Sequence, residues 1–234
     1  MPDTRLRDLQ RFYELLSALE QRLGGCRSLA TCRGHMNWPQ RGMYFFFEPG
    51  EQRSDSGSGP RVVRVGTHAV TSGSGTTLWQ RLSQHRGTLH SGGGNHRGSI
   101  FRLIVGTALS GKDGTAMPIW NDKAADRSMR ALELAHEQRV STVIGAMPFL
   151  WLAIDDEPSP QSLRGMIERN AIALLSNHGR PELDPPSAAW LGQFCDRERV
   201  RGSGLWNQRH VDEHHDPGFL DIFERLIGLS KAGA

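Results

Sequence analysis

The stretch GMYFFFEPGEQRSDSGSGPRVVRVG, residues 42–66, decides the centre of the fold. It contains two short runs rich in aromatic and β-branched residues, at 42–47 and 61–65, joined by a segment rich in Gly, Ser and Pro. Such residues fit a pleated sheet, and runs of this kind flanked by turn residues are typical of paired strands. The sequence therefore predicts a β-hairpin with a long, flexible loop.

Amphipathic helices are expected on both sides of this hairpin. Upstream, apolar residues recur at helical spacing after Asp3-Thr4 and stop at Gly24-Gly25, which predicts one capped helix. Downstream, the patterns predict helices at 76–86, 124–140, 159–176 and 219–229, and strands at 99–108 and 147–154. This order predicts an α+β fold: a small antiparallel or mixed sheet flanked by helices, with an N-terminal helix and a C-terminal helical extension.

The composition is typical of a globular protein. Of the 234 residues, 37% are hydrophobic and 23% charged, which excludes collagen, coiled-coil and disordered classes. The longest apolar runs, at 43–47 and 146–154, are far shorter than the roughly 20 residues that cross a bilayer. The chain starts without an apolar signal-peptide core, and Cys26, Cys32 and Cys195 lack CxxC spacing. We therefore expect a reduced, cytoplasmic protein without membrane contact.

Charge is distributed unevenly along the sequence. Residues 56–112 contain no Asp or Glu but six arginines and one lysine, although the whole chain has 28 Lys+Arg against 25 Asp+Glu. Such a segment predicts a positive surface that attracts nucleic acid. Arg86, Arg97 and Arg102 within it are expected to contact the nucleic-acid backbone. A basic surface kept for solubility is the alternative.

Five residues or motifs in order carry a resemblance to a known family. They are Gly42-Met43-Tyr44 on the first strand, Arg64-Val65-Gly66 on the second, Arg81 and His85 on the next helix, and Glu168 in the helix IERNAIALLSN. Together they resemble the GIY-YIG nuclease superfamily over about residues 42–177, with a long loop as in its restriction-endonuclease branch. Arg64 departs from the pattern, because the second motif usually has Tyr there. The segment before Glu168 is also longer than in the minimal module.

The resemblance implies a metal-dependent endonuclease, with DNA as the expected partner and Mg²⁺ or Mn²⁺ as the cofactor. Tyr44 would be the general base, Arg81 the phosphate and transition-state stabiliser, His85 an orienter or proton relay, and Glu168 the metal ligand. The chain would form a single domain, residues 1–234. Its parts would be an N-terminal helical segment at 1–40, a nuclease core at 41–178 and a C-terminal extension at 179–234.

The chemistry of these residues agrees with such roles. A phenol beside a metal or several arginines can act as a general base, although Tyr44 could also be an aromatic core residue. Arg81 and His85 are four apart and share one helix face, which offers a guanidinium fork for phosphate; an ordinary exposed face is the alternative. Glu168 lies on a mostly apolar helix, where a carboxylate needs a cation; a salt bridge with Arg164 would also satisfy it.

Four further residues are candidates for nucleic-acid contact. Arg64 could bind phosphate in place of the missing Tyr, or point outward along a half-exposed strand. Gly66 could permit close approach of a ligand or of a neighbouring backbone, or be a simple strand-end turn. Asn177 and Asn207 could each supply the amide that several family members place near the metal or the scissile phosphate, with Asn177 alternatively a helix C-cap.

Two other functional classes remain open from the sequence. Arg64 in place of Tyr favours a catalytically weakened nucleic-acid-binding module on the same scaffold, and a structural or partner-binding domain is the third hypothesis. For an enzyme, restriction and DNA repair are both compatible with these motifs. A restriction role would favour a homodimer that cuts both strands.

Overall fold

The computed structural model describes residues 4–115, 117–122, 124 and 126–230. The α-helices are α1 (Thr4–Leu23), α2 (Leu78–Arg86), α3 (Ile100–Asp113), α4 (Arg127–Leu132), α5 (Leu134–Ala146), α6 (Leu163–Leu175), α7 (Glu198–Ser203) and α8 (Phe219–Leu229). The strands are β1 (Arg27–Ser28), β2 (Gly42–Gln52), β3 (Pro60–Thr67) and β4 (Pro148–Ala153). Short 3₁₀ turns lie at His96–Gly98, Pro118–Asn121 and Leu191–Phe194. Within the described part of the chain, no helix is long and apolar enough to cross a membrane.

The four strands form one antiparallel sheet in the order β1-β4-β2-β3, so the predicted α+β class is confirmed. The predicted hairpin is the pair β2 and β3, and the strand predicted at 147–154 is β4. In the register of this sheet, Tyr44 on β2 lies opposite Gly66 on β3 and Trp151 on β4. The first tripeptide motif is therefore at the centre of the sheet, directly beside the second.

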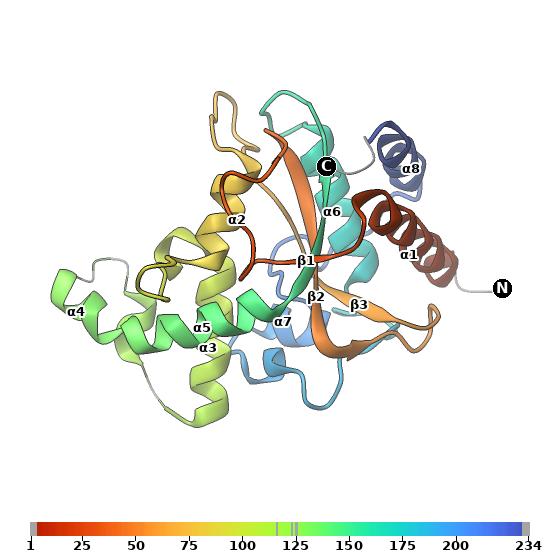
Figure 1. Ribbon diagram of the computed structural model, residues 1–234. Coiled ribbons are helices and arrows are strands. Elements are labelled where there is room, and N and C mark those ends of the chain that lie inside the picture. The colour runs from red at the N-terminus through yellow and green to blue at the C-terminus, as the bar shows by residue number, and fades with distance from the viewer. Residues whose placement is uncertain (1–3, 116, 123, 125, 231–234) are drawn as a thin grey trace.

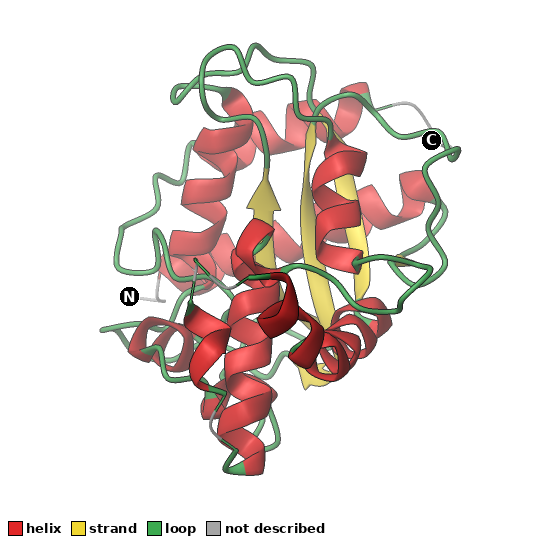
Figure 2. Ribbon diagram, turned by 90° about the vertical axis from the view of Figure 1, so that its left-hand side faces the viewer, coloured by secondary structure: helices red, strands yellow, loops and turns green. Residues whose placement is uncertain are grey.

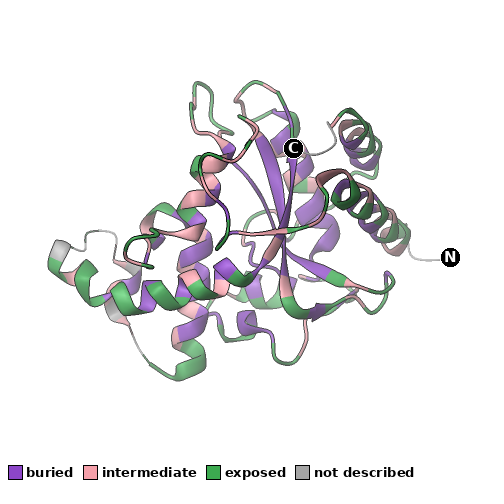
Figure 3. Cartoon of the chain, in the orientation of Figure 1, coloured by how far each residue is buried: buried purple, intermediate pink, exposed green. Residues whose placement is uncertain are grey.

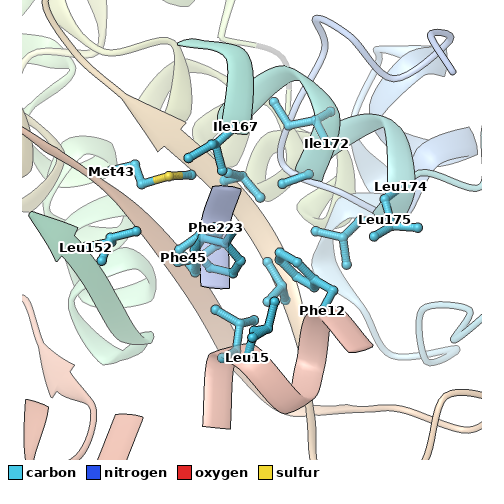
Figure 4. Packing of buried hydrophobic residues seen from close by; sticks show 14 of the residues in the cluster. Phe12, Leu15, Met43, Phe45, Leu152, Ile167, Ile172, Leu174, Leu175 and Phe223 are labelled. Atoms are coloured by element: carbon cyan, nitrogen blue, oxygen red, sulfur yellow. The ribbon is translucent and has the colours of Figure 1, made fainter. Parts of the chain in front are cut away.

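The sheet is buried on both faces. Side chains alternate along a strand, so Met43 and Phe45 face one core, while Tyr44 and Phe46 face the other. Helices α1, α6 and α8 cover the first face, and α2, α3 and α5 cover the second (Figure 1). Figure 2 shows the strands between these helical layers, and Figure 3 shows that the strands are buried along most of their length and exposed at the hairpin end of β2. The packing of Phe12, Phe45 and Phe223 in the first core is drawn in Figure 4.

The strand predicted at 99–108 is wrong: these residues belong to helix α3. Ser99 caps the helix by accepting the backbone N–H of Arg102, and Gly114 ends it in the left-handed conformation at φ 64°. The buried apolar residues follow helical spacing: Phe101, Ile104, Val105, Ala108 and Leu109. The cap and this spacing outweigh the high β propensity of the Ile, Phe and Val residues, which had suggested a strand.

The helices predicted at 76–86, 159–176 and 219–229 are confirmed with shifts of their ends. The helix expected at 124–140 is instead two helices, α4 and α5, divided at Glu133, and residue 125 of that prediction lies outside the described residues. The first helix begins at Thr4; Asp3, predicted as part of its cap, also lies outside them.

The C-terminal segment, the chain that follows α7 from Gly204 to His210, packs against β3. The backbone N–H of Trp206 donates to the carbonyl of Val63 at 2.7 Å. The side-chain amide of Asn207 bonds both backbone groups of Val65, accepting its N–H at 3.1 Å and donating to its carbonyl at 2.8 Å. This segment therefore runs along the outer edge of β3 and places Arg209 and His210 near the end of that strand.

The loop of the hairpin is anchored, although the sequence suggested a flexible one. One carboxylate oxygen of Asp184 accepts the backbone N–H groups of Ser54, Asp55 and Ser56 at 2.7–2.9 Å. A carboxylate that accepts several backbone donors fixes a turn strongly. The anchor comes from a residue far away in the sequence, so the local Gly and Ser content could not reveal it.

Candidate active site

A cavity of about 450 Å³ lies where β3 ends, between α2, α6 and the segment after Trp206. Its wall carries five basic side chains, one carboxylate and two amides. These are Arg64, Arg81, Arg97, Arg209 and His210, then Glu168, and then Asn207 and Gln208. The cavity therefore combines several cationic donors with a single carboxylate, a set suited to a phosphate group and a cation.

Tyr44 and His85 are fully buried beside this cavity. The Tyr44 hydroxyl lies 2.7 Å from Nε2 of His85, and Nδ1 of His85 lies 2.8 Å from the Ser99 hydroxyl. Burial, together with the positive charges of Arg81 and Arg64, holds the pKa of His85 well below its ordinary value. The imidazole is therefore neutral at physiological pH, and one of its nitrogens is a proton acceptor.

Gly66 provides the space for the Tyr44 ring. A Cβ atom at Gly66 would lie 2.4 Å from the Tyr44 hydroxyl oxygen and 2.5 Å from the ring carbon that bears it. Real Cβ atoms do not approach other atoms so closely, so any side chain here would displace the phenol. Gly66 therefore makes room for the side chain of Tyr44, whereas close approach of a ligand at Gly66 stays a prediction.

Arg64 lines the cavity and interacts with Tyr44. It is 5% exposed, donates to the carbonyl of Trp206 and stacks over the ring of Phe101 at 4.6 Å. Burial lowers its pKa, while Tyr44 and Glu168 favour its charged form. Its Nε–H is buried without a hydrogen-bond partner among the described residues. The alternative of an outward-pointing Arg64 is therefore wrong. Its Nε–H is free to donate a hydrogen bond to a ligand in the cavity.

Arg81 and Glu168 face the same cavity from α2 and α6. Arg81 donates to the side chain of Gln84 at 3.1 Å and to the carbonyl of Gly98 at 3.3 Å. Glu168 is partly buried, and among the described residues only its Oε1 accepts a hydrogen bond, from the backbone N–H of Thr67 at 3.1 Å. Burial raises the pKa of Glu168, while Arg64 and His210 act in the opposite direction.

The alternative salt bridge between Arg164 and Glu168 is wrong. Arg164 is fully buried and bonds Asp156 through its guanidinium and its backbone N–H. Its NH1 group donates to the carbonyl of His68 at 2.6 Å. Among the described residues Glu168 therefore has no salt-bridge partner; it accepts the Thr67 N–H and faces the arginines of the cavity.

The two candidate asparagines have separate places. Asn207 lines the cavity, with its amide bonded to β3. Asn177 lies away from that wall: it accepts from Arg5 at 2.9 Å and from the N–H of Leu183 at 3.0 Å, and donates to the Leu183 carbonyl at 3.1 Å. Asn177 thus joins α1 to the C-terminal segment, while the cap of α6 is Ser176.

The chain matches one known protein family. The family model described as GIY-YIG domain matches residues 3–232, almost the entire chain. The chain belongs to the GIY-YIG family. No curated protein and no solved structure matches it significantly. The GIY-YIG match includes the C-terminal segment, which supplies Asn207, Arg209 and His210 to the cavity.

Family membership supports nuclease-type function in general. GIY-YIG nucleases typically use divalent metals, so the donors in the cavity can be tested for fit. Glu168 is the one carboxylate among the residues that line it, and no group of three or more His, Cys, Asp or Glu side chains in the described chain could hold a metal ion. Mg²⁺ is often bound by one carboxylate together with waters and substrate phosphate. The donors present therefore fit a hard cation that is shared with the substrate.

The positive charge of residues 56–112, the acid-free segment, is partly neutralised by ion pairs in the GIY-YIG fold. Three of its arginines pair with acids from outside the segment: Arg61 with Glu51, Arg97 with Glu133, and Arg102 with Glu137. Arg102 is fully buried, so its guanidinium cannot reach a nucleic acid in this structure. Arg86 donates to the Cys32 carbonyl at 2.8 Å and lies over the Trp79 ring, outside the wall of the cavity.

Sequence reasoning missed His210, Arg209 and Ser99. His210 and Arg209 follow Trp206 and Asn207 in a loop without periodicity, and only the fold brings that loop to the cavity. His210 adopts φ 64° and bonds the Glu213 carboxylate at 2.6 Å. Ser99 could have been found, because a Ser before a run with helical spacing is a typical N-cap.

Gly66→Ala should destabilise this GIY-YIG domain and abolish its activity together. The added methyl group overlaps the Tyr44 phenol, and overpacking of this kind costs about 1–3 kcal/mol. We expect a matching loss in the free energy of unfolding, measured by urea denaturation. Gly75→Ala is the matched control, because a Cβ there meets nothing within 4 Å. Equal stability of the two variants would contradict the tight contact between Gly66 and Tyr44.

Proposed function

We propose that this protein is a metal-dependent endonuclease that hydrolyses phosphodiester bonds in DNA. The observation that carries the proposal is the convergence of Arg64, Arg81 and Glu168 on one cavity beside the buried Tyr44–His85 pair. Hydrolysis of a phosphodiester needs an activated water, cationic stabilisation of the phosphoryl oxygens and help for the leaving oxygen. Each need has a candidate among these side chains.

Tyr44 is the proposed general base. Its hydroxyl proton has an acceptor in the neutral imidazole of His85 at 2.7 Å. As the proton of Tyr44 moves toward His85, the phenolic oxygen gains the ability to take a proton from a water bound at the phosphate. Arg64, whose charge favours negative charge on Tyr44, stabilises this change. Access of the water requires the Arg64 side chain to turn toward the substrate phosphate.

Arg64 and Arg81 are the proposed phosphate ligands. Arg64 has a buried Nε–H without a hydrogen-bond partner in the described part of the chain. Within the same part, the hydrogen bonds of the Arg81 side chain go to uncharged groups. Two guanidinium forks on one phosphodiester hold it in a fixed orientation and stabilise the charge of the transition state. Asn207 is held by both backbone groups of Val65 and fixes the wall beside them.

Glu168 is the proposed ligand of Mg²⁺ or Mn²⁺. A cation bound there would neutralise charge that develops on the phosphoryl and leaving oxygens. In the absence of a cation, Glu168 would repel a phosphate. Burial raises the pKa of its carboxyl group, so ionised Glu168 is unfavourable in the fold on its own and gains from a cationic partner.

A catalytically weakened DNA-binding module is the second candidate function. It is favoured by the complete burial of Tyr44 and His85 and by Arg64 at the place of the second motif's Tyr. Such a module would use the arginines of the cavity to bind phosphate without cleaving it.

Incubation of the purified chain with supercoiled plasmid should distinguish the two functions. We expect nicking or linearisation with Mg²⁺ or Mn²⁺, none with EDTA, and DNA binding that weakens strongly between about 50 and 200 mM salt. Binding without cleavage at any metal concentration would favour the module. Single-stranded DNA, duplex DNA and RNA oligonucleotides of equal length, assayed in parallel, would identify the substrate class.

A further inference from the structure

His85 is held at both ring nitrogens by partners from different elements. Nε2 contacts the hydroxyl of Tyr44 on β2 at 2.7 Å, and Nδ1 contacts the hydroxyl of Ser99 at 2.8 Å. All three residues are at most 1% exposed. Because the imidazole is neutral, only one of its two nitrogens carries a proton. One nitrogen therefore donates a hydrogen bond, and the other accepts one.

The surroundings of Tyr44 decide which nitrogen carries the proton. A tyrosine hydroxyl keeps its proton at neutral pH as a rule and must donate it to an acceptor when buried. Among the described residues its polar neighbours are Nε2 of His85 and the guanidinium of Arg64, and a guanidinium has no acceptor. Tyr44 therefore donates to Nε2, and the proton of the imidazole lies on Nδ1.

The Ser99 hydroxyl oxygen lies where it can accept a hydrogen bond from Nδ1–H of His85. Its hydroxyl oxygen also accepts the backbone N–H of Arg102 as the N-cap of α3, at 3.3 Å. A hydroxyl oxygen has two lone pairs, so it can accept from Nδ1 and from Arg102 at the same time. The geometry at Ser99 is thus that of an acceptor fixed by the helix start.

The buried ion pair between Arg102 and Glu137 fixes the position of Ser99 relative to His85. Arg102 donates to the backbone carbonyl of His85 at 2.9 Å and to the Glu137 carboxylate at 2.9 Å. Glu137 in turn accepts from the backbone N–H of His96 at 2.7 Å. These contacts join the end of α2, the start of α3 and helix α5, so that the distance between His85 and Ser99 cannot vary freely.

We propose that Ser99 is a positioning residue that holds His85 in the Nδ1–H tautomer, so that Nε2 accepts the proton of Tyr44 during phosphodiester hydrolysis. The inference rests on the proposed function. In the reaction, a water proton passes to the Tyr44 oxygen as the Tyr44 proton passes to Nε2. The water oxygen bonds to phosphorus, and the leaving oxygen departs and is protonated by solvent. His85 then returns its proton through Tyr44 to solvent.

The tautomer can be measured without any assay of activity. In ¹⁵N-histidine-labelled protein, long-range ¹H–¹⁵N correlation distinguishes protonated from bare ring nitrogens, and the His85 signals are assigned as those absent from His85→Gln. We expect a neutral ring with protonated Nδ1 and bare Nε2 in the wild type. A neutral ring with protonated Nε2, or an imidazolium, overturns the inference, whatever the activity of the protein.

Kinetics of Ser99 variants test its role in the reaction. For Ser99→Ala we expect kcat to fall roughly 10- to 100-fold, as for other groups that orient a functional histidine, with KM and DNA affinity unchanged. Ser99→Thr, which keeps the hydroxyl, should recover most of kcat. Ser162→Ala is the control, because Ser162 is a buried serine that caps α6 through the N–H of Gly165 and its loss removes a cap alone.

The outcomes separate the inference from the proposed function. If Ser99→Ala and Ser162→Ala lose activity only in proportion to their folded fraction, Ser99 is a cap and the inference fails, while the nuclease stands. If the wild type has the expected tautomer but cleaves no nucleic acid, the proposed function fails and so does the catalytic role of Ser99. Cleavage by the wild type together with a selective loss of kcat in Ser99→Ala supports both.

Discussion

Glu168→Gln should abolish cleavage and leave DNA binding intact or tighter. The substitution keeps the shape of the side chain and its place beside the Thr67 N–H, but removes the charge that would hold the metal and would otherwise repel phosphate. It should not destabilise the protein. Burial raises the pKa of Glu168, so the folded state binds a proton more readily than the unfolded one, and the ionised group lowers stability above that pKa. We therefore expect an unchanged or higher Tm.

Asp156→Asn provides the contrast for this variant. It weakens the partner of the fully buried Arg164, and breaking a buried ion pair costs about 3–5 kcal/mol. Thermal unfolding, DNA affinity and cleavage should be measured on both variants. If Glu168→Gln unfolds like Asp156→Asn, with activity following its folded fraction, Glu168 is a structural residue and the metal-site proposal is wrong.

Tyr44→Phe should reduce cleavage by roughly 10²- to 10⁴-fold, the usual contribution of a general base. The ring remains above Gly66, and only the hydroxyl that bonds His85 is lost. Loss of one buried hydrogen bond costs about 0.5–1.5 kcal/mol, too little to unfold the domain. Single-turnover cleavage of labelled DNA at saturating protein measures the chemical step directly.

The chain contains a matched control for this experiment. Its only other tyrosine, Tyr13, lies on α1 at the opposite face of the sheet and accepts the backbone N–H of Val62 at 3.0 Å. Tyr13→Phe should cost similar stability and leave cleavage unchanged. Full activity in Tyr44→Phe would reject Tyr44 as base and make His85 the next candidate.

The sequence predicted the elements whose signals are local. The consecutive apolar and aromatic residues Met43 to Phe46 are typical of a strand that is buried on both faces, as this part of β2 is. The helix that ends at Leu229 is strongly amphipathic and was predicted with its correct bounds. The strand predicted at 99–108 was wrong because β-branched composition was weighed above the spacing of apolar residues, although Ser99 marks a helix start.

Long-range pairing was beyond prediction from one sequence. The acid-free segment suggested a strong positive field, but Glu133 and Glu137, which neutralise Arg97 and Arg102, come from α5 and the residue before it. The cavity likewise takes His210 from a loop with no periodicity. The sequence indicated which residues could act on a phosphodiester, whereas only the fold separates Asn207, in the cavity, from Asn177.

The segment that follows the outer side of β3 has a consequence for self-association. An edge strand with free backbone groups is a template for pairing with another chain, and natural proteins cover or shorten such edges. Here the carbonyl of Val63 and both backbone groups of Val65 are already occupied by Trp206 and Asn207, and at the other edge β1 is two residues long. Two copies therefore cannot join their sheets through this part of β3, and any association between copies would have to use another surface.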